Sequence, residues 1–302
     1  MITAVGSIGL DTTRTFDASV SEIPGGAVTF FSLAASLLAK VSAVSCVGTD
    51  FPKQFLEKLS KKGIDISGIE IKSGKTLRYH ATYSPDFSDR KSDLTALNVF
   101  GDFEPELSES LRKKEVAYLG TASPKTQLSV IHQLEKPKLV AMDTIEYFIK
   151  NDKPGVMRVL SEVDGIIINE SEARDLCAKA NLIACGKDIL KMGPSFCVIK
   201  KGEHGSILFS NDAGPHPFPG FPLEHVVDPT GAGDAFAGGF IGFLASGHGS
   251  KKGRDLLTAV AWGTVMGSIT VEAFGAESLL KTNRQEAQER YDIYRNLMHY
   301  EE

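Results

Sequence analysis

Residues 228–239 read DPTGAGDAFAGG, a glycine-rich turn that runs into a helix. The Gly-Ala-Gly of residues 231–233 leaves the backbone with almost no side-chain cover. From Phe236 onward apolar residues recur at spacings of three and four, as in an α-helix. Such a turn leaves several backbone N–H groups unpaired at the positive end of the helix dipole. The stretch therefore predicts a site for a phosphate, or for the charge that develops while a phosphoryl group is transferred.

Asp234 places a carboxylate in the first turn of the same helix. Beside an anion site, this carboxylate suits the removal of a proton from an alcohol that attacks phosphorus. The alternative interpretation is structural: the glycines ease a tight turn, and Asp234 complements the dipole of the helix. The four residues GAGD alone leave both interpretations open.

The bulk properties of the chain limit what kind of protein it is. At 302 residues, with 42% hydrophobic and 24% charged residues, it suits one large soluble domain over residues 1–302. A net charge of −5 argues against a surface for nucleic acid, and no apolar run reaches the length of a membrane span. Four cysteines without a CxxC pair indicate thiols in a reducing compartment. We therefore expect a cytoplasmic protein with neither nucleic acid nor a membrane as a partner.

Strand and helix patterns alternate along most of the chain. Short apolar runs typical of buried parallel strands occur at residues 2–7, 41–47, 116–119, 138–142, 165–168 and 196–199. Helical patterns lie between them at residues 25–38, 51–59, 124–134, 154–162, 170–178 and 181–192, and again after Ala235. This alternation predicts an α/β fold with a doubly wound, mostly parallel sheet and helices on both faces.

Two segments, about 12–23 and 74–100, interrupt this alternation. Polar residues there alternate with β-branched or aromatic ones, as in Thr76, Arg78 and His80. We expect both segments to form exposed antiparallel strands outside the main sheet. Because exposed strand edges invite pairing, they also predict a homodimer.

Polar residues follow the first predicted strand, where ligands of open parallel sheets bind. Asp11 ends the run GSIGLD, where it either accepts hydrogen bonds from two hydroxyls of a sugar or forms an Asx turn. Gly25 and Gly26 either let a substrate approach the backbone or simply start the next helix.

Two further motifs have an ordinary structural interpretation beside a functional one. Asn169 and Glu172 form N-x-x-E directly after a strand, which is the pattern of a helix capping box. Lys200, Gly202 and Gly205 lie in the run VIKKGEHGSILF, which predicts a strand, a turn and a second strand. The sequence contains no G-x-x-x-x-G-K-[ST] and no G-x-G-x-x-G, which excludes a P-loop and a dinucleotide fingerprint.

Taken in order, these motifs resemble the PfkB (ribokinase-like) family of carbohydrate and nucleoside kinases over nearly the whole chain. The family pattern D-T-x-G-A-G-D matches residues 228–234, with Pro229 in place of the usual Thr and Thr230 after it. The resemblance implies a ribokinase-like fold with a small β-strand lid over the sugar site. It also implies ATP and Mg²⁺ as cofactors.

The resemblance assigns expected roles to residues of this chain. The catalytic group is a general base and an anion hole of amides: Asp234, then Gly231, Ala232 and Gly233. The substrate group holds the acceptor under the lid: Asp11, Gly25, Gly26, Thr29, Arg78 and Asn98. The nucleotide group is the hairpin and the segment that closes over adenine: Lys200, Gly202, Gly205, Phe274, Gly275 and Ala276. The metal group serves hydrated Mg²⁺ through Asn169 and Glu172, and a monovalent cation such as K⁺ through Asp228.

The substrate side departs from the family pattern. The asparagine often found after the paired glycines is Ala27 here, and Thr29 offers a hydroxyl instead. Arg78 and Asn98 either contact the substrate or belong to a solvated strand face. We therefore expect a kinase that transfers the γ-phosphate of ATP to a hydroxyl of a sugar or sugar-like molecule. A nucleoside kinase and a catalytically silent sugar-binding regulator are the alternatives.

Overall fold

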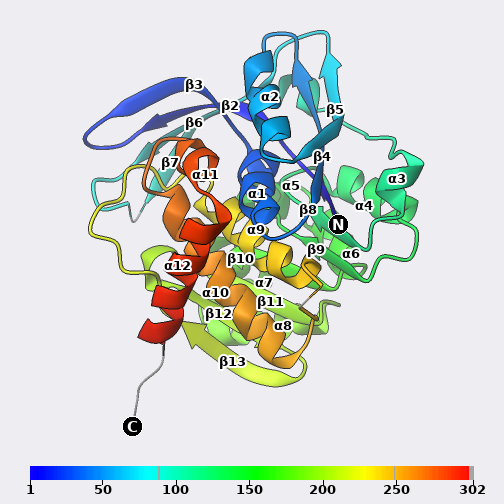
Figure 1. Ribbon diagram of the computed structural model, residues 1–302. Coiled ribbons are helices and arrows are strands. Elements are labelled where there is room, and N and C mark those ends of the chain that lie inside the picture. The colour runs from blue at the N-terminus through cyan, green and yellow to red at the C-terminus, as the bar shows by residue number, and fades with distance from the viewer. Residues whose placement is uncertain (88, 248, 299–302) are drawn as a thin grey trace.

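The body of the protein is one large twisted sheet covered by helices, as the computed structural model shows for residues 1–302 except 88, 248 and 299–302 (Figure 1). Its strands are β1 (Ile2–Val5), β4 (Val41–Gly48), β5 (Asp65–Lys72), β8 (Val116–Leu119), β9 (Leu139–Met142), β10 (Gly165–Asn169), β11 (Phe196–Lys200), β12 (Ser206–Ser210) and β13 (Ala213–Phe218). In the described part of the chain they lie in the order β13-β12-β11-β10-β9-β8-β1-β4-β5. Neighbours run parallel from β11 to β5, and only the last hairpin strands are antiparallel.

Helices cover both faces of this sheet, which confirms the doubly wound α/β prediction. One face packs against α3 (Glu109–Arg112), α4 (Pro124–Gln133), α5 (Glu146–Asn151), α6 (Lys153–Leu160), α7 (Glu170–Cys177) and α8 (Leu182–Lys191). The other packs against α1 (Ala27–Ser36), α9 (Ala232–Ala245) and α10 (Gly253–Thr270). Side chains alternate between the faces, so that Ala4 packs with the second group and Val5 with the first. In the described residues, α2 (Lys53–Lys61), α11 (Glu277–Lys281) and α12 (Arg284–Leu297) lie outside these two groups, as does the short 3₁₀ helix η1 (Asn98–Phe100).

Close backbone contacts hold α9 in place between α1 and α10. A Cβ on Gly238 would lie 2.4 Å from Phe31 O, and one on Gly239 would lie 2.4 Å from Trp262 O. Glycine at these positions lets the three helices touch, which fixes where the first turn of α9 meets the sheet. Among the described residues, no helix carries an apolar stretch long enough to cross a membrane.

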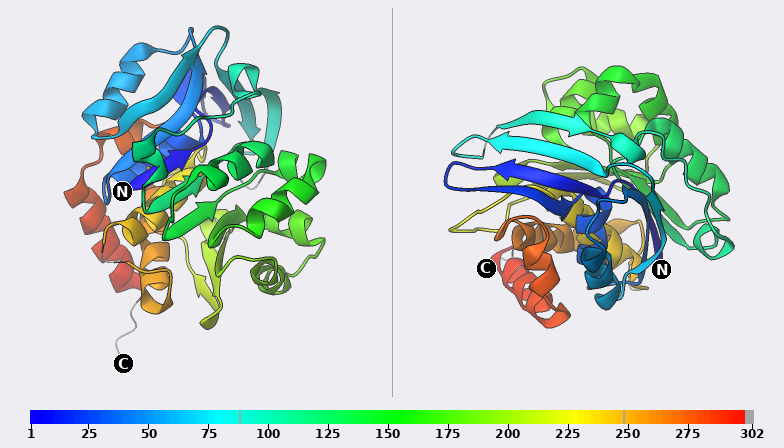
Figure 2. Two further views of the ribbon diagram at one scale, coloured as in Figure 1. Left: turned by 90° about the vertical axis from the view of Figure 1, so that its right-hand side faces the viewer. Right: turned by 90° about the horizontal axis from the view of Figure 1, so that it is seen from above.

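A second sheet projects from the body and corresponds to the predicted lid. It has the order β3-β2-β6-β7, formed by β2 (Gly9–Arg14), β3 (Ser19–Gly25), β6 (Leu77–Tyr83) and β7 (Arg90–Ala96), which lie side by side in Figure 2 (right). β2 runs antiparallel to β3, as predicted, but it runs parallel to β6 and is buried except at Arg14, where an exposed strand was expected. The reason is position: β2 lies between two other strands of the lid and directly follows β1.

Candidate active site

Polar residues converge where the parallel strands end. Asp143 follows β9, Asn169 closes β10 and Lys200 closes β11. Because these three strands are parallel neighbours, their carboxyl ends lie along one edge of the sheet. Lys200 reaches from this edge to the first turn of α9, where its Nζ lies 3.5 Å from Gly233 O. The edge therefore brings acid, amide and ammonium groups to the predicted anion site.

The turn before α9 has a shape that glycine accepts most easily. Gly231 has a φ of 79°, and a Cβ there would lie 2.3 Å from the Phe30 ring. The Ala232 amide donates to Pro229 O at 3.2 Å. Within the described part of the chain, the Gly231 and Gly233 amides have no hydrogen-bond acceptor. Of the three predicted anion-hole donors, the turn thus leaves these two free.

Asp234, the predicted base, lies partly buried in the first turn of α9. Burial, and then the nearby charge of Asp143, raise its pKa to about 7 against the opposing effects of Lys200 and Arg90. A carboxyl group with this pKa can accept a proton at neutral pH and hold it, which suits a general base.

Asp11 faces the same space from the lid. It lies inside β2, so the alternative of an Asx turn is wrong. Burial raises its pKa to about 7; a hydrogen bond from the Gly26 amide opposes this shift, and the charges of Asp228 and Asp234 add to it. A buried carboxyl group from the lid and a partly buried one from α9 therefore interact across the site.

The paired glycines fit closely around Asp11. A Cβ on Gly25 would lie 1.9 Å from Asp11 Oδ2. Gly26 has a φ of 92°, and a Cβ there would lie 2.7 Å from Ser7 O. Thr29, which is fully buried, donates its hydroxyl to Gly25 O at 2.7 Å. This hydroxyl hydrogen is therefore engaged with the backbone.

Arg78 and Asn98 are hydrogen-bonded to the protein at the start of β6. The guanidinium of Arg78 pairs with Glu22 at 2.8 Å and with Asp50 at 2.9 Å. The Asn98 amide donates to Thr76 O at 2.9 Å. The charge of Arg78 is thus balanced by two carboxylates of the chain itself.

Asn169 and Glu172 form the capping box of α7 that their spacing predicts. Asn169 Oδ1 accepts the Glu172 amide at 2.9 Å, and Glu172 Oε2 accepts the Asn169 amide at 3.0 Å. Burial, and then the charge of Asp143, raise the pKa of Glu172 to about 8. One carboxylate and one amide oxygen at this edge fit a Mg²⁺ ion that keeps most of its waters.

The predicted hairpin is present. β11 and β12 pair antiparallel around the short helical turn η2 (Gly202–His204). Gly202 has a φ of 57° and Gly205 a φ of 80°, and a Cβ on Gly205 would lie 2.0 Å from Phe218 O. Conformation and close contact thus both favour glycine at 205.

The segment predicted to close over adenine divides between two places. Phe274 and Ala276 line a cavity of about 360 Å³ whose other described walls include residues of β3 and α2. Gly275 instead donates its amide to Asp228 Oδ2 at 3.1 Å, while Asp228 Oδ1 accepts the Thr230 amide at 2.9 Å. Asp228 thereby joins the catalytic turn to the segment after α10. The adenine-wall role stays a prediction.

Thr230 connects the catalytic turn to the lid. Its hydroxyl lies 3.3 Å from Thr13 Oγ1 on β2 and 3.1 Å from the Tyr83 hydroxyl on β6. Two lid strands therefore meet one residue of the turn that carries Asp234.

Arg90 is a lid cation that the sequence did not reveal. It lies opposite Tyr83 at the start of β7, and its guanidinium is 5.8 Å from the centre of the Tyr79 ring. Its charge lowers the pKa of Asp234. Since Tyr83 contacts Thr230, Arg90 lies on the face of the lid that is turned toward the catalytic turn.

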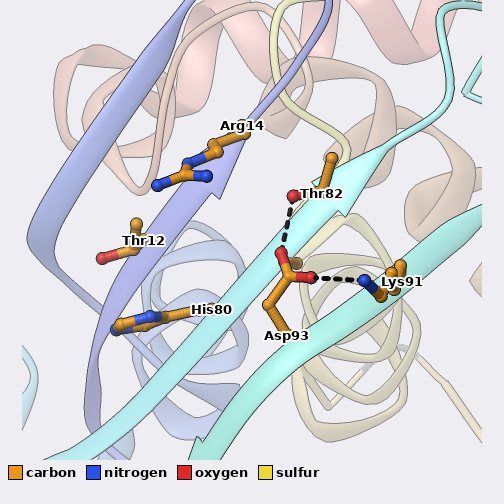
Figure 3. A pocket seen from close by; sticks show the side chains of 7 residues that line it. Thr12, Arg14, His80, Thr82, Lys91 and Asp93 are labelled. Atoms are coloured by element: carbon orange, nitrogen blue, oxygen red, sulfur yellow. Dashed lines mark hydrogen bonds and ion pairs between the residues drawn. The ribbon is translucent and has the colours of Figure 1, made fainter.

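The opposite face of the lid carries a separate polar cluster. It lines a cavity of about 470 Å³ and consists of Thr12, Arg14, His80, Ala81, Thr82, Lys91 and Asp93 (Figure 3). Asp93 accepts the Thr82 hydroxyl at 2.6 Å and pairs with Lys91 at 3.4 Å. Along β2 these residues alternate with Asp11 and Thr13, so the cluster faces away from the catalytic turn.

Comparison with known proteins agrees with this arrangement. The chain is 31% identical over 271 residues to a cytidine kinase of Thermococcus kodakarensis, which covers 87% of this chain and 92% of that one. It is 26% identical over 259 residues to a nucleoside kinase of Methanothermobacter thermautotrophicus, at 84% and 80% coverage. A putative ribokinase II of E. coli, solved in complex with ATP and Mg²⁺, has the same fold, with a TM-score of 0.78 at 18% identity over 97% of this chain and 99% of that one.

The family model that matches the chain describes the pfkB family of carbohydrate kinases, and the match spans residues 10–283. It includes both carboxyl groups of the site, the capping box, the hairpin and the turn before α9. The chain therefore belongs to the pfkB family, with a ribokinase-like fold, and is a phosphotransferase whose acceptor is a hydroxyl group.

Proposed function

We propose that this enzyme transfers the γ-phosphate of ATP to a hydroxyl of a ribose ring, with a nucleoside as the first acceptor to test. The observation that carries the chemistry is the partly buried Asp234, whose pKa of about 7 suits a base, beside the free Gly231 and Gly233 amides. The choice of acceptor class rests on the relatives, which include a cytidine kinase and a nucleoside kinase. A free sugar or polyol is the second candidate, because Asp11 can accept the hydroxyls of any sugar ring.

The proposed reaction is a single in-line transfer. Asp11 accepts hydrogen bonds from acceptor hydroxyls while the Gly25-Gly26 backbone forms the floor of the site. Asp234 takes the proton of the attacking hydroxyl as its oxygen bonds to the γ-phosphorus. The bond from that phosphorus to the β–γ bridging oxygen breaks, and ADP leaves. The Gly231 and Gly233 amides donate to the phosphoryl oxygens, and the Ala232 amide stabilises the turn through Pro229.

The cofactors follow from the same edge of the sheet. Asn169 and Glu172 would hold hydrated Mg²⁺, which neutralises phosphate charge when it is bound. Lys200 and the hairpin glycines Gly202 and Gly205 would contact the triphosphate side of ATP. Asp228, which joins the catalytic turn to Gly275, would serve as the anionic ligand of a monovalent cation.

The test is ADP release over a panel of nucleosides, free sugars and polyols, measured in K⁺ and in Na⁺ buffers. We expect turnover on at least one ribonucleoside, a higher rate in K⁺, and a loss of at least about 10²-fold in kcat for Asp234→Asn. Turnover on none of the panel would favour the catalytically silent regulator, and equal turnover by Asp234→Asn would remove the base. We also propose a cytoplasmic location, where ATP and nucleosides are available.

A further inference from the structure

A buried ion pair lies directly under the catalytic turn. Lys200 Nζ is 3.3 Å from Asp143 Oδ2 and 3.5 Å from Gly233 O. The side chains of the two charged residues are 14% and 8% exposed. A buried ion pair of this kind is costly to form, and loss of one partner leaves an uncompensated charge. Its position beside the turn therefore calls for a functional explanation.

The carboxylate of Asp143 is held in one orientation. Its Oδ1 accepts the Thr144 amide at 2.7 Å, which leaves Oδ2 for the ammonium. The Asp143 carbonyl accepts Gln127 Nε2 at 3.0 Å, so the backbone is also fixed. On the other side, a Cβ on Gly233 would lie only 2.9 Å from Lys200 Nζ. Lys200 thus fits between an oriented carboxylate and a bare glycine.

The ammonium has other acids within electrostatic reach. Asp143, Glu172 and Asp234 each favour the charged form of Lys200. Among them, Asp143 is the one that hydrogen-bonds to it. Without Asp143, the ammonium would be left to the two other acids that favour its charged form, Glu172 and the catalytic base Asp234.

We propose that Asp143 is a positioning residue that reserves the Lys200 ammonium for the transferred phosphoryl group. It holds the ammonium at Gly233, beside the free amides of the turn, and keeps it from pairing with Asp234. The base then stays free to take a proton while the cation faces the developing phosphate charge. This inference rests on the proposed kinase reaction.

The electrostatics around Asp234 support this separation of roles. Asp143 raises the pKa of Asp234, whereas Lys200 and Arg90 lower it. Asp11 on the lid and the buried Tyr118 hydroxyl of β8 also interact with the charge of Asp234. Loss of the Asp143 charge would leave the two cations unopposed by the nearest acid and make Asp234 a weaker base.

The experiment compares pH profiles of kcat and kcat/KM for Asp143→Asn, Lys200→Met and the double variant. For Asp143→Asn we expect kcat to fall about tenfold or more. The acidic limb of its pH profile, which reports the pKa of Asp234 and lies near pH 7 in the parent enzyme, should move to lower pH by about one unit. The double variant has no ammonium to pair with Asp234, so its acidic limb should return upward although kcat stays low. KM for the acceptor should change little, because neither residue contacts Asp11.

A matched control is Asp164→Asn. Asp164 also combines a lysine partner, Lys251, with a backbone amide, that of Val140, but it precedes β10 at the opposite edge of the sheet. The acidic limb of the pH profile of Asp164→Asn should stay where it is in the parent enzyme. An unmoved limb in a folded, active Asp143→Asn, or a limb that stays low in the double variant, would overturn the positioning role. If the parent has no turnover, or Asp234→Asn keeps it, the proposed reaction itself is wrong. The melting temperature of each variant separates these outcomes from misfolding.

Discussion

At the scale of single residues, the site depends on carboxyl groups whose pKa burial raises, so that they are partly protonated near pH 7. Asp11 and Asp234 both have a pKa of about 7. Asp11 lies against the backbone of Gly25, and Asp234 follows the glycine turn that begins at Gly231. The glycines beside Asp11 and Asp234 are therefore important for the site, because they let each carboxyl group lie close to the main chain.

Gly25→Ala tests this directly. A Cβ at residue 25 would lie 1.9 Å from Asp11 Oδ2, so the carboxylate must move away from the acceptor. We expect acceptor KM to rise about tenfold or more, with a smaller change in KM for ATP. Steady-state kinetics in both substrates measures this, and Gly214→Ala, where a Cβ meets nothing within 4 Å, is the control. An unchanged acceptor KM would separate Gly25 from the substrate site.

Single residues also show how far the sequence alone can lead. Asp234 and its turn were identifiable because the motif is local, and Asp143 could have been found by the rule that ligands bind where parallel strands end. Arg90 could not have been identified from the sequence, because the face of the lid on which it lies depends on how β6 pairs with β7. A shift in register between His80 and Ala81 places Tyr83 opposite Arg90. No pattern within 74–100 announces such a shift.

At the scale of elements, the lid has two faces with different chemistry. Arg90 lies on the face toward the catalytic turn, whereas Arg14 lies with the polar cluster on the opposite face. The sequence predicted a lid cation but selected Arg78, whose charge is balanced by Glu22 and Asp50. Distinguishing these three arginines required the register of the sheet.

We predict that Arg90→Gln lowers kcat about 10–100-fold, because it removes a cation that faces the base and the phosphate site. It should also raise the acidic limb of the pH profile, since Arg90 lowers the pKa of Asp234. Arg14→Gln on the opposite face should change neither quantity. Matching pH profiles for the two variants would contradict an inward role for Arg90.

At the scale of the whole molecule, the helices and the main sheet followed from periodicity, because buried parallel strands and amphipathic helices are repeated local patterns. The strands of the lid were also predicted from their alternating pattern, but their pairing was not, because β2 pairs with β6 across a sequence separation that no local pattern encodes. The same folding brings acids from β2, β9 and α9 into one buried site, and this has a cost in stability.

The ligand-free protein should lose stability as the pH rises. Asp11 and Asp234 have pKa values of about 7 in the folded protein, against an ordinary 3.8. Their protonation therefore contributes fully to the free energy of unfolding below about pH 4, and this contribution is lost as the pH rises through 7. Asp234→Asn should therefore raise the melting temperature more at pH 8 than at pH 5, by roughly 2–4 °C for each kcal/mol relieved. Thermal melts without ligand measure this; equal gains at both pH values would contradict it.

We propose that two copies of the chain pair through their lids. β7 is an edge strand of the lid, exposed along most of its length, and it carries Leu94, which is 42% exposed. Light scattering should give twice the chain mass, and Leu94→Asp should reduce it to one chain. Ile293→Asp, at an exposed apolar residue of α12, is the control. A single-chain mass for the parent would remove the dimer.

The Thr230 hydroxyl, which lies between Thr13 and Tyr83, has a consequence for how this enzyme selects its acceptor. Since one residue of the catalytic turn touches two strands of the lid, we expect any opening or closing of the lid to shift the turn that carries Asp234. An acceptor that keeps the lid ajar would also leave the base misaligned. Discrimination between acceptors should then appear in the rate of turnover more than in the strength of binding.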